Sequence, residues 1–271
     1  METSFESIYK NHYEKLYTLS FRMTGNREDA EDVLQTAFLN ACRAFDKFRG
    51  DADIATWLYR IVINTSKKFW KDAAKLPADS YAEETGQSLE SVFDHINSFG
   101  TAEDTVLVNQ IRESCLQMFM NCMPAVYRAV FTLRVILGFS VKEVMEILDL
   151  SESSVKVSLH RARKTAASHF NGRCSLVKPG AMCSCRSFAG YLRENGKTGK
   201  LLDIEIIQDR EKTAREKYEK EISDILKIDR LYRNRIKPVD YSRFIRHVKE
   251  LARSGNNKLI KIPGQKKSTV H

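Results

Sequence analysis

The chain has 271 residues, carries 44 Lys or Arg against 35 Asp or Glu, and is 42% hydrophobic. This size is typical of one large or two small folded domains, and the composition excludes disordered and fibrous proteins. No segment approaches the ~18 uninterrupted apolar residues that a membrane-spanning helix needs. The first ten residues hold two glutamates and no apolar run, which argues against a signal peptide. A cytoplasmic protein without membrane insertion is therefore expected.

Positive charge is concentrated in the last third of the chain. Residues 173–271 hold 24 Lys or Arg and 12 Asp or Glu, whereas residues 1–172 hold 20 and 23. The stretch 153–193 has eight basic residues and no acid, and residues 75–104 have one Lys and seven acids. A basic block of this kind favours contact with a polyanion such as nucleic acid, and a solvated basic surface is the alternative.

Hydrophobic periodicity predicts three helices before residue 75. The first has Thr3 and Glu6 placed as a capping box and ends at the turn of residues 24–26, whose Asn can cap the next helix. The second has one apolar and one acidic face, and a third with a basic outer face follows the break at residues 49–51. Three such helices can pack as a small bundle, which predicts a domain over residues 1–74.

The next segment, residues 75–104, loses this periodicity and gains Pro, Gly and acidic residues. It is therefore predicted to be an acidic linker. Periodicity returns over residues 105–172, where Pro124 stands in the first turn of one helix and Gly138 is placed to end it. This range is predicted to be a second helical domain.

Residues 138–169 have the pattern of a helix-turn-helix. Ser140 and Glu143 form a capping box for a short helix over 141–148, and Ser151 can cap a longer one. Short hydroxyl side chains near the start of the longer helix would let it enter a major groove closely, and basic residues further along would meet phosphates. The alternative is an ordinary bundle helix with a solvated basic face. The outward positions are Ser153, Ser154, Lys156, Ser158, His160, Arg161, Arg163 and Lys164.

With both domains in view, the chain resembles the extracytoplasmic-function (ECF) group of bacterial sigma factors, the compact members of the sigma-70 family. The resemblance covers about residues 5–172 and implies an all-α fold, with a sigma region 2-like bundle followed by a region 4-like helix-turn-helix. Either part alone is suggestive, and the two in this order and separation are a strong indication. The motifs are DAEDVLQTAF at residues 29–38, FDKFRG at 45–50, TWLYRI at 56–61 with Asn64, and the helix-turn-helix from Gly138 to Arg163.

The resemblance implies a role for each face of the first domain. The acidic face of the second helix would dock on core RNA polymerase through Asp29, Asp32 and Gln35, where complementary charge orients the contact. The following loop and third helix would bind the −10 promoter element and capture an unstacked base. For Trp57, a place in the core is an equal alternative. The residues assigned to the −10 element are Arg49, Gly50, Asp51, Trp57, Arg60, Asn64, Lys67 and Lys68.

Region four of the family reads the −35 element as duplex through the longer helix of the helix-turn-helix. The acidic linker would pass through polymerase toward the RNA exit path, and a spacer without contacts is the alternative. The residues expected to contact bases are Ser153, Ser154, Lys156 and Ser158, and those expected to hold phosphates are Arg161, Arg163 and Lys164.

No phosphate-binding loop and no Ser/His/Asp grouping can be argued from spacing, so an enzyme is not expected. Polymerase would perform the chemistry, and no cofactor would be required. Core RNA polymerase and promoter DNA are the expected partners, and a separate anti-sigma factor is a further candidate. Two other functions stay open: a stand-alone helix-turn-helix regulator, and a metal or thiol sensor whose DNA binding is secondary.

A cysteine cluster follows the predicted DNA-reading helix. In a cytoplasmic protein such a cluster indicates metal binding or redox activity more often than a structural disulfide. The spacing H-x4-C-x8-C-x-C supplies four candidate zinc ligands but is not among the strong zinc signatures, and a reduced loop without a ligand is the alternative. The candidate ligands are His169, Cys174, Cys183 and Cys185, whereas Cys42, Cys115 and Cys122 lie within helical patterns and are predicted to be core or incidental thiols.

The region 173–271 lies outside the resemblance and forms a basic C-terminal extension. Apolar positions from Ile207 to Ile236 predict a long amphipathic helix, followed by a short helix around residues 244–251 and a basic tail. The extension could fold back on the sigma domains as a regulator, contact DNA or polymerase, or bind a separate partner. Its charge favours nucleic acid.

Overall fold

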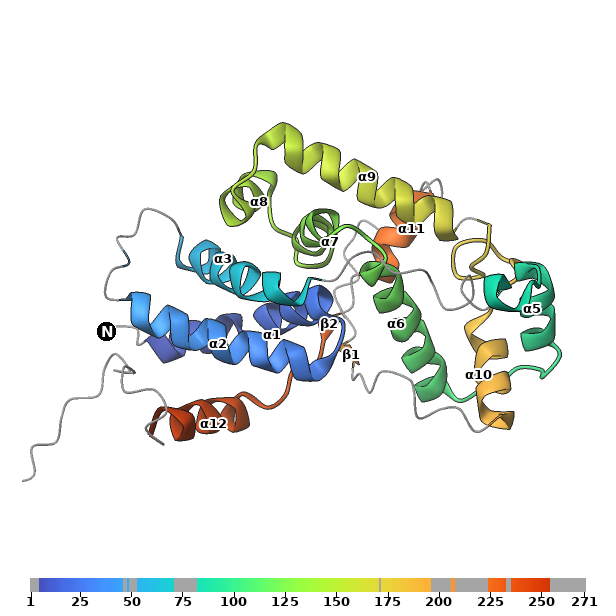
Figure 1. Cartoon of the computed structure of the whole chain (residues 1–271), viewed down its shortest axis with the longest axis horizontal. Helices are drawn as coiled ribbons and strands as arrows, with labels where there is room; N and C mark the ends of the chain where they lie inside the picture. The colour runs from blue at the N-terminus through green and yellow to red at the C-terminus, as the bar shows by residue number, and fades with distance from the viewer. Residues whose placement is uncertain are drawn as a thin grey trace, which may run out of the picture.

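The structure, a computed structural model, describes residues 5–45, 48, 53–70, 82–170, 172–195, 206–207, 224–232 and 235–253. Within these ranges the fold is helical apart from one pair of two-residue strands (Figure 1). The predicted all-α class is therefore confirmed. None of the described helices is both long enough and apolar enough to cross a membrane.

The first three helices form the predicted bundle. They are α1 (Phe5–Thr24), α2 (Arg27–Phe45) and α3 (Ile54–Ser66), with a short 3-10 turn, η1 (Lys67–Phe69), after the third. Gly25 adopts a φ of 90° and ends α1, as only a residue without a Cβ does freely. The Asp29 amide donates to the Asn26 side-chain oxygen at 2.8 Å, which confirms the predicted cap of α2. The capping box predicted at Thr3 lies outside the described residues.

The helix-turn-helix is also present where the sequence predicts it. Its two helices are α8 (Val141–Leu148) and α9 (Glu152–Phe170), and the second domain begins before them with α6 (Thr105–Asn121), α7 (Ala125–Phe131) and a π-helical turn, η2 (Thr132–Ile136). The Glu143 amide donates to Ser140 Oγ at 3.2 Å and the Ser140 amide donates to the Glu143 carboxylate at 2.6 Å, so the capping box is confirmed. The Ser154 amide donates to Ser151 Oγ at 3.2 Å at the start of α9. Asp149, with a φ of 56°, makes the tight turn between the two helices.

A helix lies where the sequence predicted a linker without periodic structure. This helix, α5 (Leu89–Asn97), packs against α10 (Cys185–Glu194) of the extension through Phe93 and Ile96. Ser88 caps it by accepting a hydrogen bond from the Ser91 amide at 3.1 Å. The prediction is wrong for this part, because Leu89, Val92, Phe93 and Ile96 fall at helical spacing and a partner distant in sequence buries them.

The long helix predicted from Ile207 to Ile236 is wrong at both of its ends. Strand β1 (Ile206–Ile207) pairs antiparallel with strand β2 (Arg235–Ile236), and between them α11 (Asp224–Leu231) is the helical part that the structure describes. The short helix predicted near residues 244–251 is confirmed and is longer, as α12 (Tyr241–Arg253).

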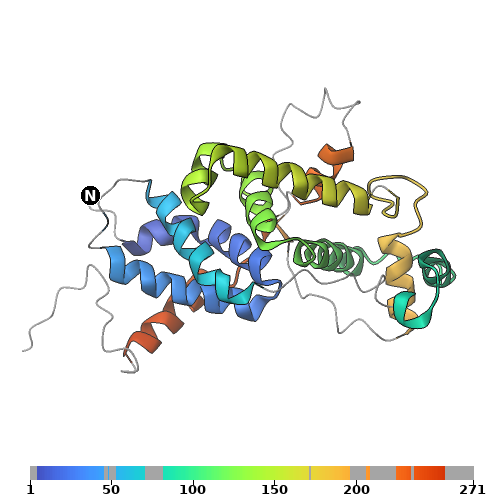
Figure 2. The ribbon, with the colours of Figure 1, turned by 45° about the horizontal axis from the view of Figure 1, so that its top comes forward.

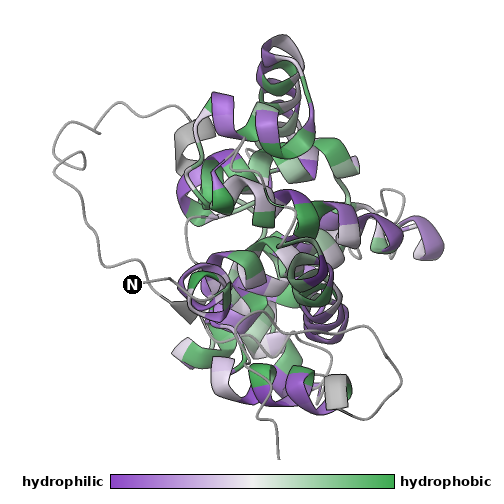
Figure 3. Ribbon diagram, turned by 90° about the vertical axis from the view of Figure 1, so that its left-hand side faces the viewer, coloured by the Kyte–Doolittle hydropathy of each residue, from purple (hydrophilic) through white to green (hydrophobic). Residues whose placement is uncertain are grey.

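A single hydrophobic core joins the two sigma-like regions and the extension. Buried side chains from α1, α2, α3, α6, α7, α8, α9, α11 and α12 belong to one continuous cluster. Figure 3 shows that the helices carry both hydrophobic and hydrophilic positions, as amphipathic helices around a shared core do. In both Figure 1 and Figure 2, α9 and α12 lie on opposite sides of the molecule.

Candidate nucleic-acid and protein interfaces

The acidic face of α2 is partly in use within the molecule. The Asn26 amide group donates to the Asp29 carboxylate at 2.7 Å, so Asp29 takes part in the helix cap. Asp32 is exposed and Gln35 is half-buried, and both line an open groove of about 430 Å³ between α2 and α12. In the same groove, burial raises the pKa of Glu31, against the lowering effect of Arg27 and other nearby cations. Two of the three predicted polymerase contacts therefore face the extension.

Three of the residues predicted to bind the −10 element meet at one pocket. Trp57, Asn64 and Lys68 line an open pocket of about 490 Å³ between α2 and α3, together with polar side chains such as Asn40. The Trp57 ring is half-buried and lies 5.1 Å from the ring of Phe48, centroid to centroid. Trp57 thus borders the core and also presents an edge to the pocket, so the two alternatives for it are not exclusive.

The other −10 candidates are placed differently. Arg60 is exposed, and its Nε donates to the backbone carbonyl of Glu146 on α8 at 3.0 Å. Beside this contact, the ring of Tyr59 meets the ring of Phe139 edge to face at 4.6 Å. The region 2-like bundle therefore packs against the helix-turn-helix through α3. Lys67 is exposed to solvent, and the candidates Arg49, Gly50 and Asp51 lie outside the described residues.

The outer face of α9 is open over its first half. Ser153, Ser154 and Lys156 are exposed, and Lys156 pairs with Glu152 at 2.5 Å across one helical turn. Ser158 is 7% exposed, so its predicted outward position is wrong. Ser158 lies three residues after the buried Val155 and four before the buried Ala162, which places it on the inner face of the helix.

Two of the predicted phosphate ligands on α9 already have protein partners. Arg161 donates to the hydroxyl of Tyr127 at 2.9 Å and stays exposed. Arg163 makes a two-pronged contact with the carboxylate of Asp229 on α11, in which its Nε donates at 3.2 Å and its Nη2 donates to the second oxygen. Planar, bidentate pairs of this kind are among the stronger ionic contacts. Lys164 is exposed.

Comparison with known proteins decides the family. The sigma-70 region 2 family model matches residues 8–76, and a sigma-70 region 4 model matches residues 113–165. The ECF RNA polymerase sigma factor SigW of Bacillus subtilis is 31% identical over 60% of this chain and 87% of its own length. The chain belongs to the ECF group of the sigma-70 family. It is a promoter-recognising sigma factor that directs transcription initiation.

Other relatives match the sigma factor over a similar part. The RNA polymerase sigma-H factor of Pseudomonas aeruginosa is 30% identical over 59% of this chain and 83% of its own length. The ECF sigma-E factor of Escherichia coli K12 is 32% identical over 50% of this chain and 71% of its own length. Neither family model reaches beyond residue 165, so the C-terminal extension of this sigma factor has to be understood from its own structure.

The cysteine cluster of the sigma factor surrounds a small apolar cavity. Cys174, Cys183 and Cys185 line a space of about 140 Å³ together with Cys115 of α6, which the sequence had suggested was a core or incidental thiol. All four are free thiols. Burial raises the pKa of Cys183 to about 12 and that of Cys185 to about 11, so both are protonated at neutral pH.

The fourth predicted zinc ligand does not join the thiols in a coordinating group. The His169 ring stacks on Phe119 at 5.2 Å with an interplanar angle of 21°, although it also borders the cavity. Among the residues that the structure describes, no three or more His, Cys, Asp or Glu side chains are arranged to hold a metal ion. Zinc at this cluster stays a prediction.

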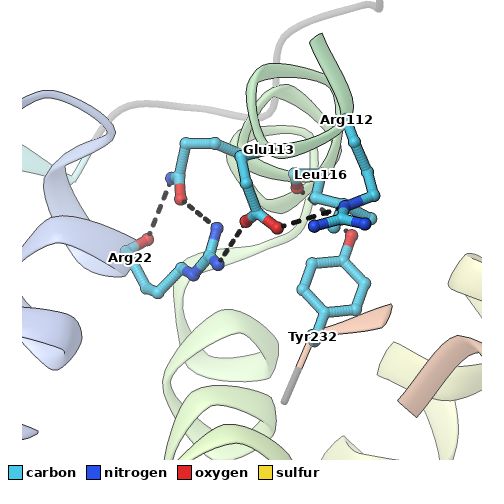
Figure 4. A network of polar contacts seen from close by, with 6 residues as sticks. Arg22, Arg112, Glu113, Leu116 and Tyr232 are labelled. Carbon is cyan, nitrogen blue, oxygen red and sulfur yellow. Dashed lines mark hydrogen bonds and ion pairs between the residues drawn. The ribbon is translucent and has the colours of Figure 1, made fainter. Parts of the chain in front are cut away.

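Sequence reasoning missed the polar junction between the two sigma domains (Figure 4). Arg22 of α1 is fully buried, and its guanidinium donates at 3.1 Å both to Glu113 and to Gln117 of α6. The hydroxyl of Tyr232, from the extension, donates to the backbone carbonyl of Leu116 at 3.2 Å. The extension therefore contacts the point where the two domains meet. Periodicity could not reveal this, since it places an arginine on a helix face but names no partner 91 residues away.

Proposed function

We propose that three surfaces of this sigma factor divide the work of initiation. The acidic face of α2 docks on core RNA polymerase, the pocket between α2 and α3 holds an unstacked base of the −10 element, and the outer face of α9 reads the −35 duplex. The observation that carries this proposal is the meeting of Trp57, Asn64 and Lys68 at one open pocket of about 490 Å³. A nucleobase needs those three features together: a ring to stack on, an amide to pair with and a cation for its phosphate.

The pocket suits single-stranded rather than duplex DNA. Stacking a base on an aromatic side chain contributes ~1–3 kcal/mol, which offsets part of the cost of unstacking it from the duplex. The amide of Asn64 can both donate and accept, so it can reach a base edge. Lys67 and Lys68 are exposed at the rim, where they would attract the displaced strand.

The −35 contact is proposed for the exposed start of α9. Ser153 and Ser154 are small enough to let the helix approach base edges, and Lys156 can leave its exposed pair with Glu152 for an acceptor in the groove. Arg161 and Lys164 lie further along, where phosphates border the groove. For Arg163 to join them, its contact with Asp229 has to break.

Polymerase supplies the chemistry in this proposal, and the sigma factor is expected to contribute no catalytic group. Its partners are core RNA polymerase and promoter DNA, and an anti-sigma factor remains a candidate. We place the sigma factor in the cytoplasm because core RNA polymerase and promoter DNA are found there.

Run-off transcription with purified core polymerase tests the proposal. The full chain is expected to direct initiation from a promoter with −10 and −35 elements, and Trp57→Ala should lower open-complex formation roughly 5- to 150-fold through lost stacking. The matched control is Trp70→Ala, because the Trp70 indole donates to Ser66 at 3.2 Å and does not line the pocket. Absence of specific initiation by the full chain would contradict the proposal. Specific duplex binding without polymerase, together with no initiation, would favour the stand-alone regulator.

A further inference from the structure

The last described helix, α12, is seated on the bundle that the proposed function assigns to polymerase. Phe244 of α12 is 8% exposed, and its ring lies 5.0 Å from that of Tyr13, 6.1 Å from that of Phe38 and 6.3 Å from that of Tyr9. Val248, one helical turn later, is 1% exposed. The helix therefore packs through a continuous apolar face against α1 and α2 and does not merely rest on their surface.

Polar contacts fix the position of α12. Lys249 lies 2.9 Å from the carboxylate of Glu6 on α1, and the hydroxyl of Tyr241 donates to the backbone carbonyl of the same Glu6 at 3.2 Å. The Arg243 amide donates to the carboxylate of Asp240 at 3.1 Å, which caps the helix. These contacts hold both the start and the middle of α12 on the bundle.

Opposite charges face each other across the groove between α2 and α12. The side of α2 contributes Asp32 and Gln35, two of the three residues assigned to core polymerase. The side of α12 is rich in cations, so the extension offers the acidic face a positively charged partner, as a polymerase surface that recognises it would have to do. The residues of α12 that line the groove are Arg243, Phe244, Arg246, His247 and Glu250.

A short tether keeps α12 near this site. Tyr232 is completely buried at the junction of the two domains, where its ring also meets Phe131 at 5.1 Å. Eight residues separate Tyr232 from the start of α12. A segment held so close to its binding surface has a high effective concentration there, so it can compete with a separate protein that binds tightly.

We propose that α12 is a built-in competitor of core polymerase for the acidic face of α2. The inference rests on the proposed function of that face and adds its regulation. Polymerase then binds only the fraction of molecules in which α12 has left the bundle, and its apparent dissociation constant is the intrinsic one divided by that fraction. The same extension holds Arg163 of α9 through Asp229, so closure also removes one phosphate ligand from the −35 surface.

Binding of full-length variants to core polymerase, followed by fluorescence anisotropy, tests the competition. Phe244→Asp places a charge on the buried face and should free α12, so affinity for core polymerase should rise about tenfold or more. Ser242→Asp is the matched control, because Ser242 is exposed on the same helix and the added acid lies in its first turn, where it is tolerated. Equal affinity of the wild type and Phe244→Asp would overturn the proposal.

A charge swap tests the same competition even if Phe244→Asp does not fold. Lys249→Glu should repel Glu6 and raise polymerase affinity about two- to fivefold, in keeping with a half-exposed pair, and Glu6→Lys/Lys249→Glu should restore the wild-type value. If all variants bind alike and initiate, the competitor role fails while the proposed function stands. If none of the chains binds polymerase, the proposed function itself fails, and the competitor role with it.

Discussion

The two helices assigned to macromolecular partners, α2 and α9, are covered to different degrees. On α9, Ser153, Ser154 and Lys156 are open to solvent, whereas on α2 Gln35 is half-buried and the exposed Asp32 lines a groove whose other wall is α12. The two helices also face different sides of the molecule, because α12 and α9 lie opposite each other (Figures 1 and 2). A duplex contact can therefore begin on the closed chain, whereas we expect docking on polymerase to require the extension to move.

Part of the positive charge of the extension faces acidic residues of the sigma-like bundle. The excess of basic residues in 173–271 suggested nucleic acid as its partner, yet α12 directs Lys249 at Glu6 and places Arg243 beside Glu31. This part of the positive charge is matched to acids of the same molecule. Contact of the remaining extension with nucleic acid stays a prediction.

The largest expected effect comes from the junction that couples the two regions. Arg22→Ala leaves Glu113, which is 1% exposed, as a buried charge without its main partner. Removing one member of a buried pair destabilises by ~3–5 kcal/mol, and urea unfolding should show a loss of this size.

The control is the double variant Arg22→Met/Glu113→Met, which removes both charges and should lose much less stability than Arg22→Ala. A loss below about 1 kcal/mol for Arg22→Ala would mean that this junction contributes little to holding α1 of the first domain against α6 of the second.

The thiols beside α9 should be nearly inert at neutral pH. Since the pKa of Cys183 is raised to about 12 and that of Cys185 to about 11, alkylation by iodoacetamide at pH 8 should be roughly 100-fold slower at Cys185 and roughly 1,000-fold slower at Cys183 than in the unfolded chain. The rate should rise about tenfold per pH unit until the thiols ionise, as mass spectrometry can follow. Labelling at pH 7 as fast as in urea would revive the thiol-sensor alternative and place a sensor on the α9 side.

Release of Arg163 from Asp229 should strengthen the binding of α9 to −35 duplex DNA. Asp229→Asn removes the carboxylate that holds Arg163, so affinity for a −35 duplex should rise about three- to tenfold and the salt dependence should steepen by about one phosphate contact. Glu194→Gln is the control, because it removes an acid of the extension whose paired cation, Arg193, lies on α10 rather than α9. Equal affinities in all three chains would show that closure leaves the −35 surface unaffected.

The smallest predicted effect concerns the turn that sets the angle of α9. Asp149 has a φ of 56°, a left-handed conformation that costs a residue with a Cβ more than it costs glycine. Asp149→Gly should therefore stabilise the chain by about 0.5–1 kcal/mol in thermal unfolding. Gly138→Ala, at a φ of 77°, should act in the opposite direction. Destabilisation by Asp149→Gly would show that the side chain of Asp149 contributes more than its backbone costs.

Local sequence rules were sufficient for the parts of this fold that depend on neighbours in the chain. The cap at Asn26, the capping box of Ser140 and Glu143 and the helix over 141–148 all rest on contacts within four residues. Long-range contacts decided the rest. Ile206 pairs with Ile236 and Ile207 with Arg235 as short strands, although the apolar spacing of this segment fits a helix.

For the candidate site, too, the sequence predicted local placement but not long-range contacts. Spacing placed Trp57, Asn64 and Lys68 on one helix, and their common pocket with α2 follows from the bundle. Spacing could not show that α12 would line the groove at Asp32, since residues about 200 positions apart meet there. The error at Ser158 was avoidable, because the residue falls on the same helical face as Val155 and Ala162.

Amide hydrogen exchange of the unmodified chain, alone and bound to core polymerase, tests whether α12 and polymerase compete for the acidic face of α2. If polymerase and α12 compete for one face, residues 241–253 should exchange faster in the holoenzyme than in the free chain, while α2 stays protected because polymerase replaces the helix that left. Unchanged or stronger protection of α12 in a holoenzyme that initiates transcription would contradict the account, because the two partners would then bind different surfaces.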